Sequence, residues 1–164
     1  MRRGASLGVD IGRVIIAGPS SPGATGEDTS FFDGDLDAMV RTPPVDGVFD
    51  VLPALVGRFA EVWLVSKCGE RTQRRTELWL AHHRFFERTG IEPDHVRFCR
   101  RRADKAVHCR ELGITHFVDD RRDVLDAMRG VVPHRYLFGP QSEPIPPDVV
   151  HTPNWTDVRA ALLA

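Results

Sequence analysis

Four polar features of this chain have residue types and spacings that suit metal-assisted phosphoryl transfer. Asp10 follows an apolar run, Ser66 ends a second run, Lys105 stands near the start of a helix-like stretch, and Asp119-Asp120 ends a third run. A carboxylate can attack phosphorus as a nucleophile. Paired carboxylates supply the hard oxygen ligands that Mg²⁺ prefers, and an ammonium group and a hydroxyl stabilise the charge of a transferring phosphoryl group.

These features require elements that bring them together, and the pattern of the chain predicts such elements. Apolar runs alternate with helix-like stretches, which is typical of an α/β fold with a central parallel sheet, a three-layer sandwich of Rossmann-like type. In such sheets the carboxyl ends of the strands share one edge, where ligands bind. The expected strands lie in residues 5–16, 61–65, 96–99, 115–118 and 135–138, and the expected helices span 46–59, 70–89, 104–112, 124–128 and 156–163.

Two segments depart from this alternation. Residues 18–47 are rich in Gly, Pro, Ser, Thr and acids around Phe31-Phe32, and they are too long for an ordinary connection between a strand and a helix. They are expected to form a flap or minor cap insertion, with disorder as the alternative. Residues 140–164 are expected to form a Pro-rich linker and a last helix.

One helix boundary can be predicted from its residues. In the expected helix at 46–59, Asp50 is a candidate N-cap, since its side chain can accept a backbone hydrogen bond. This start would place Pro53 in the first turn, where proline is tolerated.

Length and composition predict a single soluble domain spanning residues 1–164. Hydrophobic residues make up 41% and charged residues 27%, and the net charge of −1 gives no overall attraction to nucleic acid or anionic lipid. Only two of the 22 basic residues are lysine, namely Lys67 and Lys105. Both fall near the proposed site, where a compact ammonium group behaves differently from an arginine fork.

The sequence features that report on compartment favour the cytoplasm. Three cysteines are an odd number without framework spacing, which predicts a reducing environment and no structural disulfide. The N-terminal apolar run is too short for a signal peptide, and no stretch approaches the roughly 20 apolar residues of a membrane span. We therefore expect no membrane partner.

The same features resemble the four motifs of the haloacid dehalogenase-like superfamily. Leu7–Gly12 (LGVDIG) resembles the first motif, Val62–Ser66 (VWLVS) the second, Lys105 the third and Phe117–Asp120 (FVDD) the fourth. The resemblance spans roughly residues 5–138. It implies a haloacid dehalogenase-like fold and a Mg²⁺-dependent hydrolase, predicted here to be a phosphatase that forms an aspartyl-phosphate.

The resemblance and the residue chemistry together assign roles. Asp10 is the expected nucleophile, Ser66 donates to a phosphate oxygen, and Lys105 neutralises charge on Asp10 and the phosphate. The expected metal ligands are Asp10, the Gly12 carbonyl, Asp119 and Asp120. Structural alternatives remain open, because a strand-end Asp can occupy a turn and Ser or Asp can cap the next helix.

Gly12 departs from the family pattern. Phosphatases of this superfamily usually carry an acid there, which protonates the leaving oxygen and then activates water. The flap offers substitutes, namely Glu27, Asp28, Asp33, Asp35 and Asp37, although a solvated acidic loop is the simpler interpretation. A second hypothesis is therefore a catalytically degenerate protein that binds a phosphate ligand or a partner. A third is a metal-free dehalogenase, which the Asp119-Asp120 pair disfavours.

Basic residues near the expected active edge suggest the substrate class. Arg100-Arg101-Arg102 precedes Lys105, and Lys67 follows Ser66. Arginine forks bind phosphate with two parallel hydrogen bonds. We expect a phosphorylated small molecule or nucleotide, with a polynucleotide end as a further option and a solvated basic loop as the structural alternative.

Overall fold

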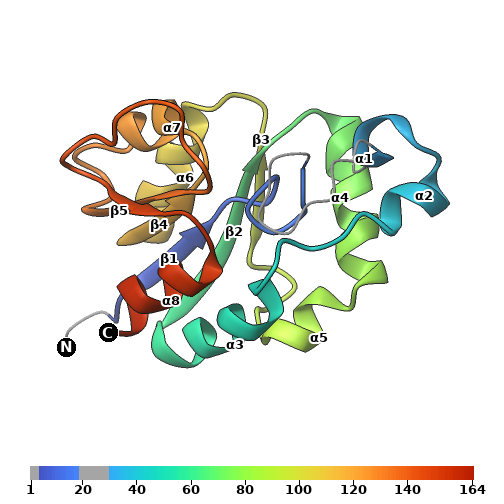
Figure 1. The fold of residues 1–164 in the computed structure, drawn as a ribbon, viewed down its shortest axis with the longest axis horizontal. Helices are drawn as coiled ribbons and strands as arrows, with labels where there is room; N and C mark the ends of the chain where they lie inside the picture. The colour runs from blue at the N-terminus through green and yellow to red at the C-terminus, as the bar shows by residue number, and fades with distance from the viewer. Residues whose placement is uncertain (1–3, 19–29) are drawn as a thin grey trace.

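The computed structural model describes residues 4–18 and 30–164, which form an α/β sandwich around a parallel sheet (Figure 1). The sheet has six strands in the order β3-β2-β1-β4-β5-β6, and every neighbouring pair is parallel. The predicted fold class is confirmed. The strands are β1 (Ser6–Val9), β2 (Glu61–Lys67), β3 (Val96–Cys99), β4 (His116–Asp119), β5 (His134–Phe138) and β6 (Val150–Thr152).

Helices cover both faces of the sheet. They are α1 (Ser30–Asp33), α2 (Leu36–Val40), α3 (Val48–Arg58), α4 (Glu70–His82), α5 (Phe85–Thr89), α6 (Asp104–Leu112), α7 (Arg122–Ala127) and α8 (Trp155–Leu163). One core lies between the sheet and α3, α4, α5 and α8, and the other lies between the sheet and α6 and α7. No helix in the described ranges is long and apolar enough to span a bilayer.

Alternation along β2 supplies both cores. Val62 and Leu64 face the α3 side, whereas Trp63 and Val65 face the α6 side. Successive side chains of a strand point to opposite faces, so a central strand covered on both sides is apolar throughout. At Gly8 in β1, an added Cβ would lie 2.5 Å from the Phe117 ring, so this position accepts only a residue without a side chain.

The expected helix at 70–89 is wrong in one respect, because two helices occupy this range. Arg84 adopts a left-handed conformation with φ of 52° and separates α4 from α5. The break allows Phe85 to be fully buried, with its ring 5.9 Å from that of Phe49 in α3. Tertiary packing has therefore overridden a continuous helical pattern.

The predicted cap of α3 is also wrong. Its N-cap is Gly47, at φ of 86°, and Asp50 lies within the first turn. Val48 is 1% exposed, so beginning the helix at this residue buries an apolar side chain that a start at Asp50 would leave outside. Pro53 consequently lies in the second turn rather than the first.

The segment at 140–164 contains one strand that the sequence did not reveal. Strand β6 adds three residues to the edge of the sheet beside β5. Helix α8 then begins at Trp155, where the Asn154 side chain caps it by accepting a hydrogen bond from the Asp157 amide. The Trp155 side chain is fully buried, and its Nε1 donates to the Val14 carbonyl at 2.8 Å.

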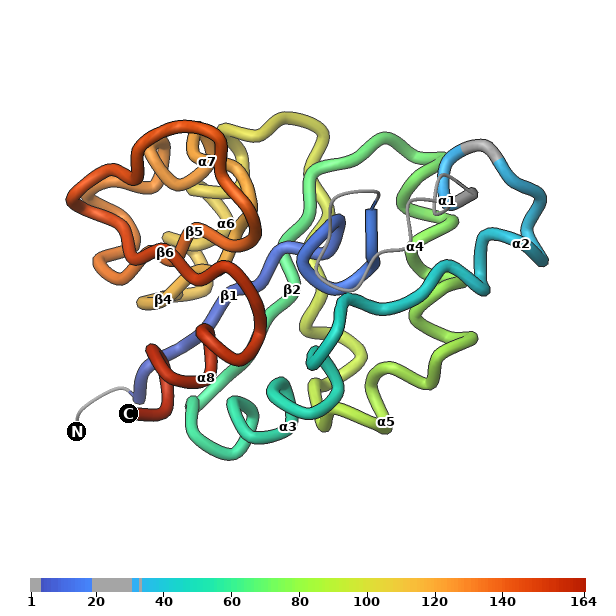
Figure 2. The backbone as a smooth tube through the Cα atoms, in the orientation of Figure 1, coloured from blue at the N-terminus to red at the C-terminus, as the bar shows by residue number. Residues whose placement is uncertain are grey.

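The described part of segment 18–47 carries two short helices beside α4 (Figure 2). Arg75 of α4 is buried and donates hydrogen bonds to the carbonyls of Phe31 and Gly34, both at 3.0 Å. Helix α2 begins at Leu36 and is capped by Asp35, whose carboxylate accepts a hydrogen bond from the Ala38 amide at 2.7 Å. The arginine therefore holds the α1 segment against α4.

Candidate active site

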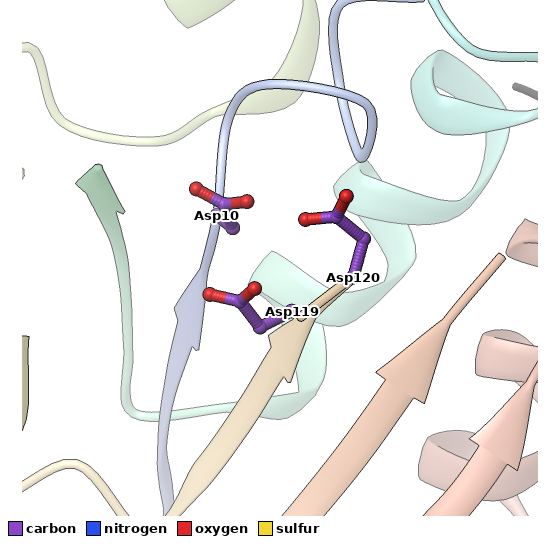
Figure 3. Close-up of side chains that lie close together, drawn as sticks. All are labelled: Asp10, Asp119 and Asp120. Atoms are coloured by element: carbon purple, nitrogen blue, oxygen red, sulfur yellow. The ribbon is translucent and has the colours of Figure 1, made fainter. Parts of the chain in front are cut away.

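The polar residues predicted at strand ends meet at the carboxyl edge of three adjacent strands. Asp10 follows β1, Ser66 is the penultimate residue of β2, and Asp119 ends β4. The strand register places these residues at similar heights along the sheet, because Val9 of β1 is paired with Leu64 of β2 and with Val118 of β4. Figure 3 shows the carboxylates of Asp10, Asp119 and Asp120 turned toward one another.

Lys105 links two of these carboxylates. It is the second residue of α6, and its Nζ lies 2.9 Å from Oδ1 of Asp10 and 2.7 Å from Oδ2 of Asp119. The lysine is 2% exposed. Burial alone would lower its pKa, but the adjacent carboxylates of Asp10 and Asp119 more than offset this and raise the pKa above its ordinary value. The ammonium group therefore remains charged and fixes both acids.

Three carboxylates crowd this edge, with one oxygen from each of Asp10, Asp119 and Asp120 within 4.8 Å of the others. Burial, followed by the charge of Asp10, raises the pKa of Asp119 to about 7. Burial, the charges of Asp10 and Asp119, and a hydrogen bond to Asp10 raise the pKa of Asp120 to about 8. Excess negative charge of this kind favours a bound cation.

The donor set fits a hard divalent cation, although the three acids are not equivalent. Asp119 is fully buried and already accepts hydrogen bonds from Lys105 at Oδ2 and from the Arg121 amide at Oδ1. Asp10 and Asp120 line the cleft. Carboxylates that face a solvent-accessible cleft are ligands of the kind that Mg²⁺ uses together with waters and phosphate oxygens.

A cleft of about 540 Å³ opens above these acids. The cleft contains the expected phosphate-binding groups as well as the carboxylates. Its lining includes Gly12, Ser66, Lys67, Arg102 and Lys105. The cleft also reaches the loop after β1, the first half of α4 with the turn before it, the α1 segment and the start of α7, through Arg13, Ile16, Ala17, Gly18, Cys68, Gly69, Thr72, Thr76, Phe31, Phe32, Arg121 and Val124.

Solved structures with the same architecture are known. The chain is similar to a haloacid dehalogenase-like hydrolase of Burkholderia xenovorans LB400, with a TM-score of 0.62, 12% identity and 98% of both chains covered. A hydrolase of this kind from Xanthomonas campestris has a TM-score of 0.63 and 10% identity over 97% of this chain and 94% of its own.

A third structure, a hydrolase of the same superfamily from Ehrlichia chaffeensis, has a TM-score of 0.63 and 12% identity over 99% of this chain and 98% of its own. This chain has the haloacid dehalogenase-like fold. The sequence itself matches no protein-family model and no curated protein. The likeness therefore lies in the backbone, and the chemistry has to be argued from this chain's own residues.

Within this haloacid dehalogenase-like fold the three consecutive arginines have different environments. Arg100 donates to the Cys68 carbonyl at 2.8 Å and to the Gln73 side chain at 2.9 Å. Arg101 forms an ion pair with Asp104 at 3.3 Å, which leaves Arg102 as the arginine of this run that lines the cleft. The structure thus separates three residues that the sequence presents as one cluster.

Gly12 leaves space beside the carboxylates. A Cβ added there would meet no atom within 4 Å, and its φ lies outside the left-handed region. Among the described residues, Asp10 and Asp120 are the carboxylic acids that line the cleft. The alternatives Asp35 and Asp37 are exposed on α2, whereas Glu27, Asp28 and the Asp33 side chain lie outside the described part of the chain.

Sequence reasoning missed Arg13 and gave Phe32 no role. Arg13 has φ of 64°, and its guanidinium lies 4.0 Å from Oδ2 of Asp120. Phe32 lines the cleft and is 58% exposed. The sequence carries no signal for either position, because a left-handed arginine is uncommon and an exposed phenylalanine has no periodic pattern.

Proposed function

We propose that this chain is a Mg²⁺-dependent hydrolase of phosphate esters that transfers a phosphoryl group to Asp10. The observation that carries the proposal is the Lys105 ammonium group, which binds both Asp10 and Asp119 at the base of a cleft that Asp120 also lines. A nucleophilic carboxylate, a fixed cation and a second cleft-facing carboxylate are the groups that phosphoryl transfer to a protein requires.

The reaction proceeds in two displacements. An oxygen of Asp10 forms a bond to phosphorus while the bond from phosphorus to the ester oxygen breaks, and the ester oxygen leaves with the electron pair and takes a proton from solvent water. A second water molecule then attacks the phosphorus of the aspartyl-phosphate and gives up a proton to solvent. The bond from phosphorus to Asp10 breaks, inorganic phosphate leaves, and the carboxylate is regenerated.

The residues around Asp10 orient its carboxylate and neutralise the charge of the phosphate. Lys105 holds Oδ1 of Asp10 and keeps the carboxylate from rotating, while the Ser66 hydroxyl donates to a phosphate oxygen. Asp119 accepts a second hydrogen bond from Lys105 and thereby fixes the position of the ammonium group. Asp10, Asp120 and the Gly12 carbonyl would hold the metal, with Asp119 acting on it or on its waters. When bound, Mg²⁺ screens the repulsion between the carboxylate and the phosphate.

A panel of phosphorylated metabolites and nucleotides, together with p-nitrophenyl phosphate, tests this proposal. We expect phosphate release that requires Mg²⁺ and disappears in Asp10→Asn. The matched control is Asp37→Asn on the exposed face of α2, which should retain the wild-type rate. Release that persists in Asp10→Asn would remove Asp10 from the mechanism, and halide release in the presence of a chelator would favour the dehalogenase alternative.

The open space at Gly12 favours a second candidate, a protein that binds a phosphate ligand without turning it over. General acid–base assistance contributes about 10² to 10⁴-fold to such reactions, and no described residue other than Asp10 and Asp120 offers a carboxylic acid to the cleft. Mg²⁺-dependent binding of a phosphate analogue, without release from any substrate of the panel, would support this candidate.

A further inference from the structure

Two cations that line the cleft form no ion pair with the carboxylates of the site. Lys67 ends β2 beside Cys99 of β3, and Arg102 lies three residues further on, in the turn before α6. Both line the cleft and both are exposed. Within residues 4–18 and 30–164, neither forms an ion pair, in contrast to Lys105 and Arg13, which contact the acids.

Three of the five cations that line the cleft already have acidic partners. Lys105 is paired with Asp10 and Asp119, Arg13 lies 4.0 Å from Asp120, and Arg121 is paired with Asp123. The other two, Lys67 and Arg102, have no ion pair within the described residues and can face a second anion. In the proposed reaction Lys105, together with a metal held by Asp10 and Asp120, would stabilise the transferring phosphoryl group. Lys67 and Arg102 would then face a further anionic group of the same ligand, for which an arginine fork and an ammonium group are suitable donors.

The α1 segment contributes an exposed aromatic ring to the same cleft. The Phe32 ring is 58% exposed and meets the buried Phe31 edge to face, with centroids 5.2 Å apart. Arg75 holds the Phe31 carbonyl at 3.0 Å, and Arg71 donates to the Phe32 carbonyl at 3.3 Å. An exposed ring on an anchored backbone is a platform on which a planar base can stack.

We propose that the substrate is a nucleotide that carries two phosphate groups. One phosphate is transferred at Asp10, the second binds Lys67 and Arg102, and the base lies on Phe32. The transfer of the first phosphate to Asp10 rests on the function proposed above, whereas the binding of the second phosphate and of the base does not depend on it. Two sources share this chemistry, a nucleoside 3′,5′-bisphosphate and a nucleoside diphosphate.

Calorimetric binding in the presence of Mg²⁺ tests the subsite with three probes: adenosine 3′,5′-bisphosphate, ADP and AMP. A charged hydrogen-bonding pair predicts that at least one two-phosphate probe binds about 10- to 100-fold more tightly than AMP. The tighter of the two identifies the source. Arg102→Ala and Lys67→Ala should each remove most of that preference, whereas the neighbouring Arg101→Ala, whose side chain pairs with Asp104, should preserve it.

A separate set of binding measurements tests the stacking role of Phe32. Phe32→Ala should weaken all three adenine nucleotides by about 5- to 100-fold, the usual loss when a stacking ring is removed, and should leave ribose 5-phosphate unchanged. Phe32→Tyr should retain the affinity. Equal binding of AMP and both two-phosphate probes, or adenine binding unaffected by Phe32→Ala, would overturn the proposal.

This test is separable from that of the proposed function. Release from p-nitrophenyl phosphate that depends on Asp10, together with no preference for two phosphates, would retain the hydrolase and reject the subsite. Selective binding of a two-phosphate nucleotide, lost in Arg102→Ala but without phosphate release from any substrate, would retain the subsite and reject the hydrolase.

Discussion

Replacing Gly12 by Asp should increase Mg²⁺-dependent phosphate release. The position lines the cleft, its φ suits an L-amino acid, and an added Cβ meets no atom within 4 Å. A carboxylic acid there can protonate the leaving oxygen and then accept a proton from water. Such assistance is worth about 10² to 10⁴-fold, which corresponds to a barrier lowered by about 3–5 kcal/mol.

The substitution should be tolerated by the fold. Removing a glycine restricts the unfolded chain and stabilises by about 0.4–1 kcal/mol where the native conformation is compatible. A fourth acid beside Asp10, Asp119 and Asp120 opposes this gain through charge repulsion, which Mg²⁺ relieves. We therefore expect Gly12→Asp to unfold near the wild-type urea midpoint when Mg²⁺ is present, and to be less stable than wild type in EDTA.

The assay is steady-state phosphate release from p-nitrophenyl phosphate, and from an alkyl phosphate whose poor leaving group needs protonation. The gain should be larger for the alkyl ester. Gly12→Asn is the matched control, because it has nearly the same shape but cannot transfer a proton. Gly12→Asp combined with Asp10→Asn should be inactive. If a folded, Mg²⁺-binding Gly12→Asp is no faster than Gly12→Asn, missing proton transfer does not limit this site.

Three further predictions concern stability and can be measured by urea denaturation. Lys105→Met leaves buried carboxylates without their cation and should cost about 3–5 kcal/mol at pH 8, whereas the same change at exposed Lys67 should stay within about 0.5 kcal/mol; equal losses would contradict the buried pairing. In EDTA, the free energy of unfolding should fall as the pH rises from about 4 to 8. The pKa values of Asp119 and Asp120 are about 7 and 8 in the folded state against an ordinary 3.8, so the folded state keeps protons that the unfolded chain releases. Mg²⁺ should weaken this pH dependence, and a stability that rises over the same range in EDTA would refute the prediction. Trp155→Phe loses a buried hydrogen bond and should lower the free energy of unfolding by about 1–3 kcal/mol; an unchanged free energy of unfolding would contradict the role given to the indole nitrogen.

The polar residues that follow the predicted strands were the most informative part of the sequence. Asp10, Lys105 and Asp119 are separated by more than a hundred positions in total, yet the structure brings their charged atoms within hydrogen-bond distance. This convergence could be anticipated because parallel strands share their carboxyl edge. The predicted fold class depended only on the alternation of strands and helices, which is a long-range pattern with many residues to support it.

Features set by single side chains could not be anticipated. Arg100 and Arg102 are two residues apart and chemically identical, and only tertiary neighbours decide that one binds the Cys68 carbonyl while the other faces the cleft. The break at Arg84 and the start of α3 at Val48 likewise follow from which apolar residue reaches the core. A three-residue edge strand such as β6 has too few positions to show alternation.

Trp155 connects the α8 helix to the neighbourhood of the reacting carboxylate. Its indole nitrogen holds the Val14 carbonyl, two residues beyond Gly12, and its ring lies 5.6 Å from that of Phe138 at the end of β5. Gly47 approaches the same side chain from the start of α3, where an added Cβ would lie 3.1 Å from the Trp155 Cβ. The Trp155 side chain thus lies against three segments that are distant in the sequence, and its indole hydrogen bond ties the start of α8 to the turn that follows Gly12.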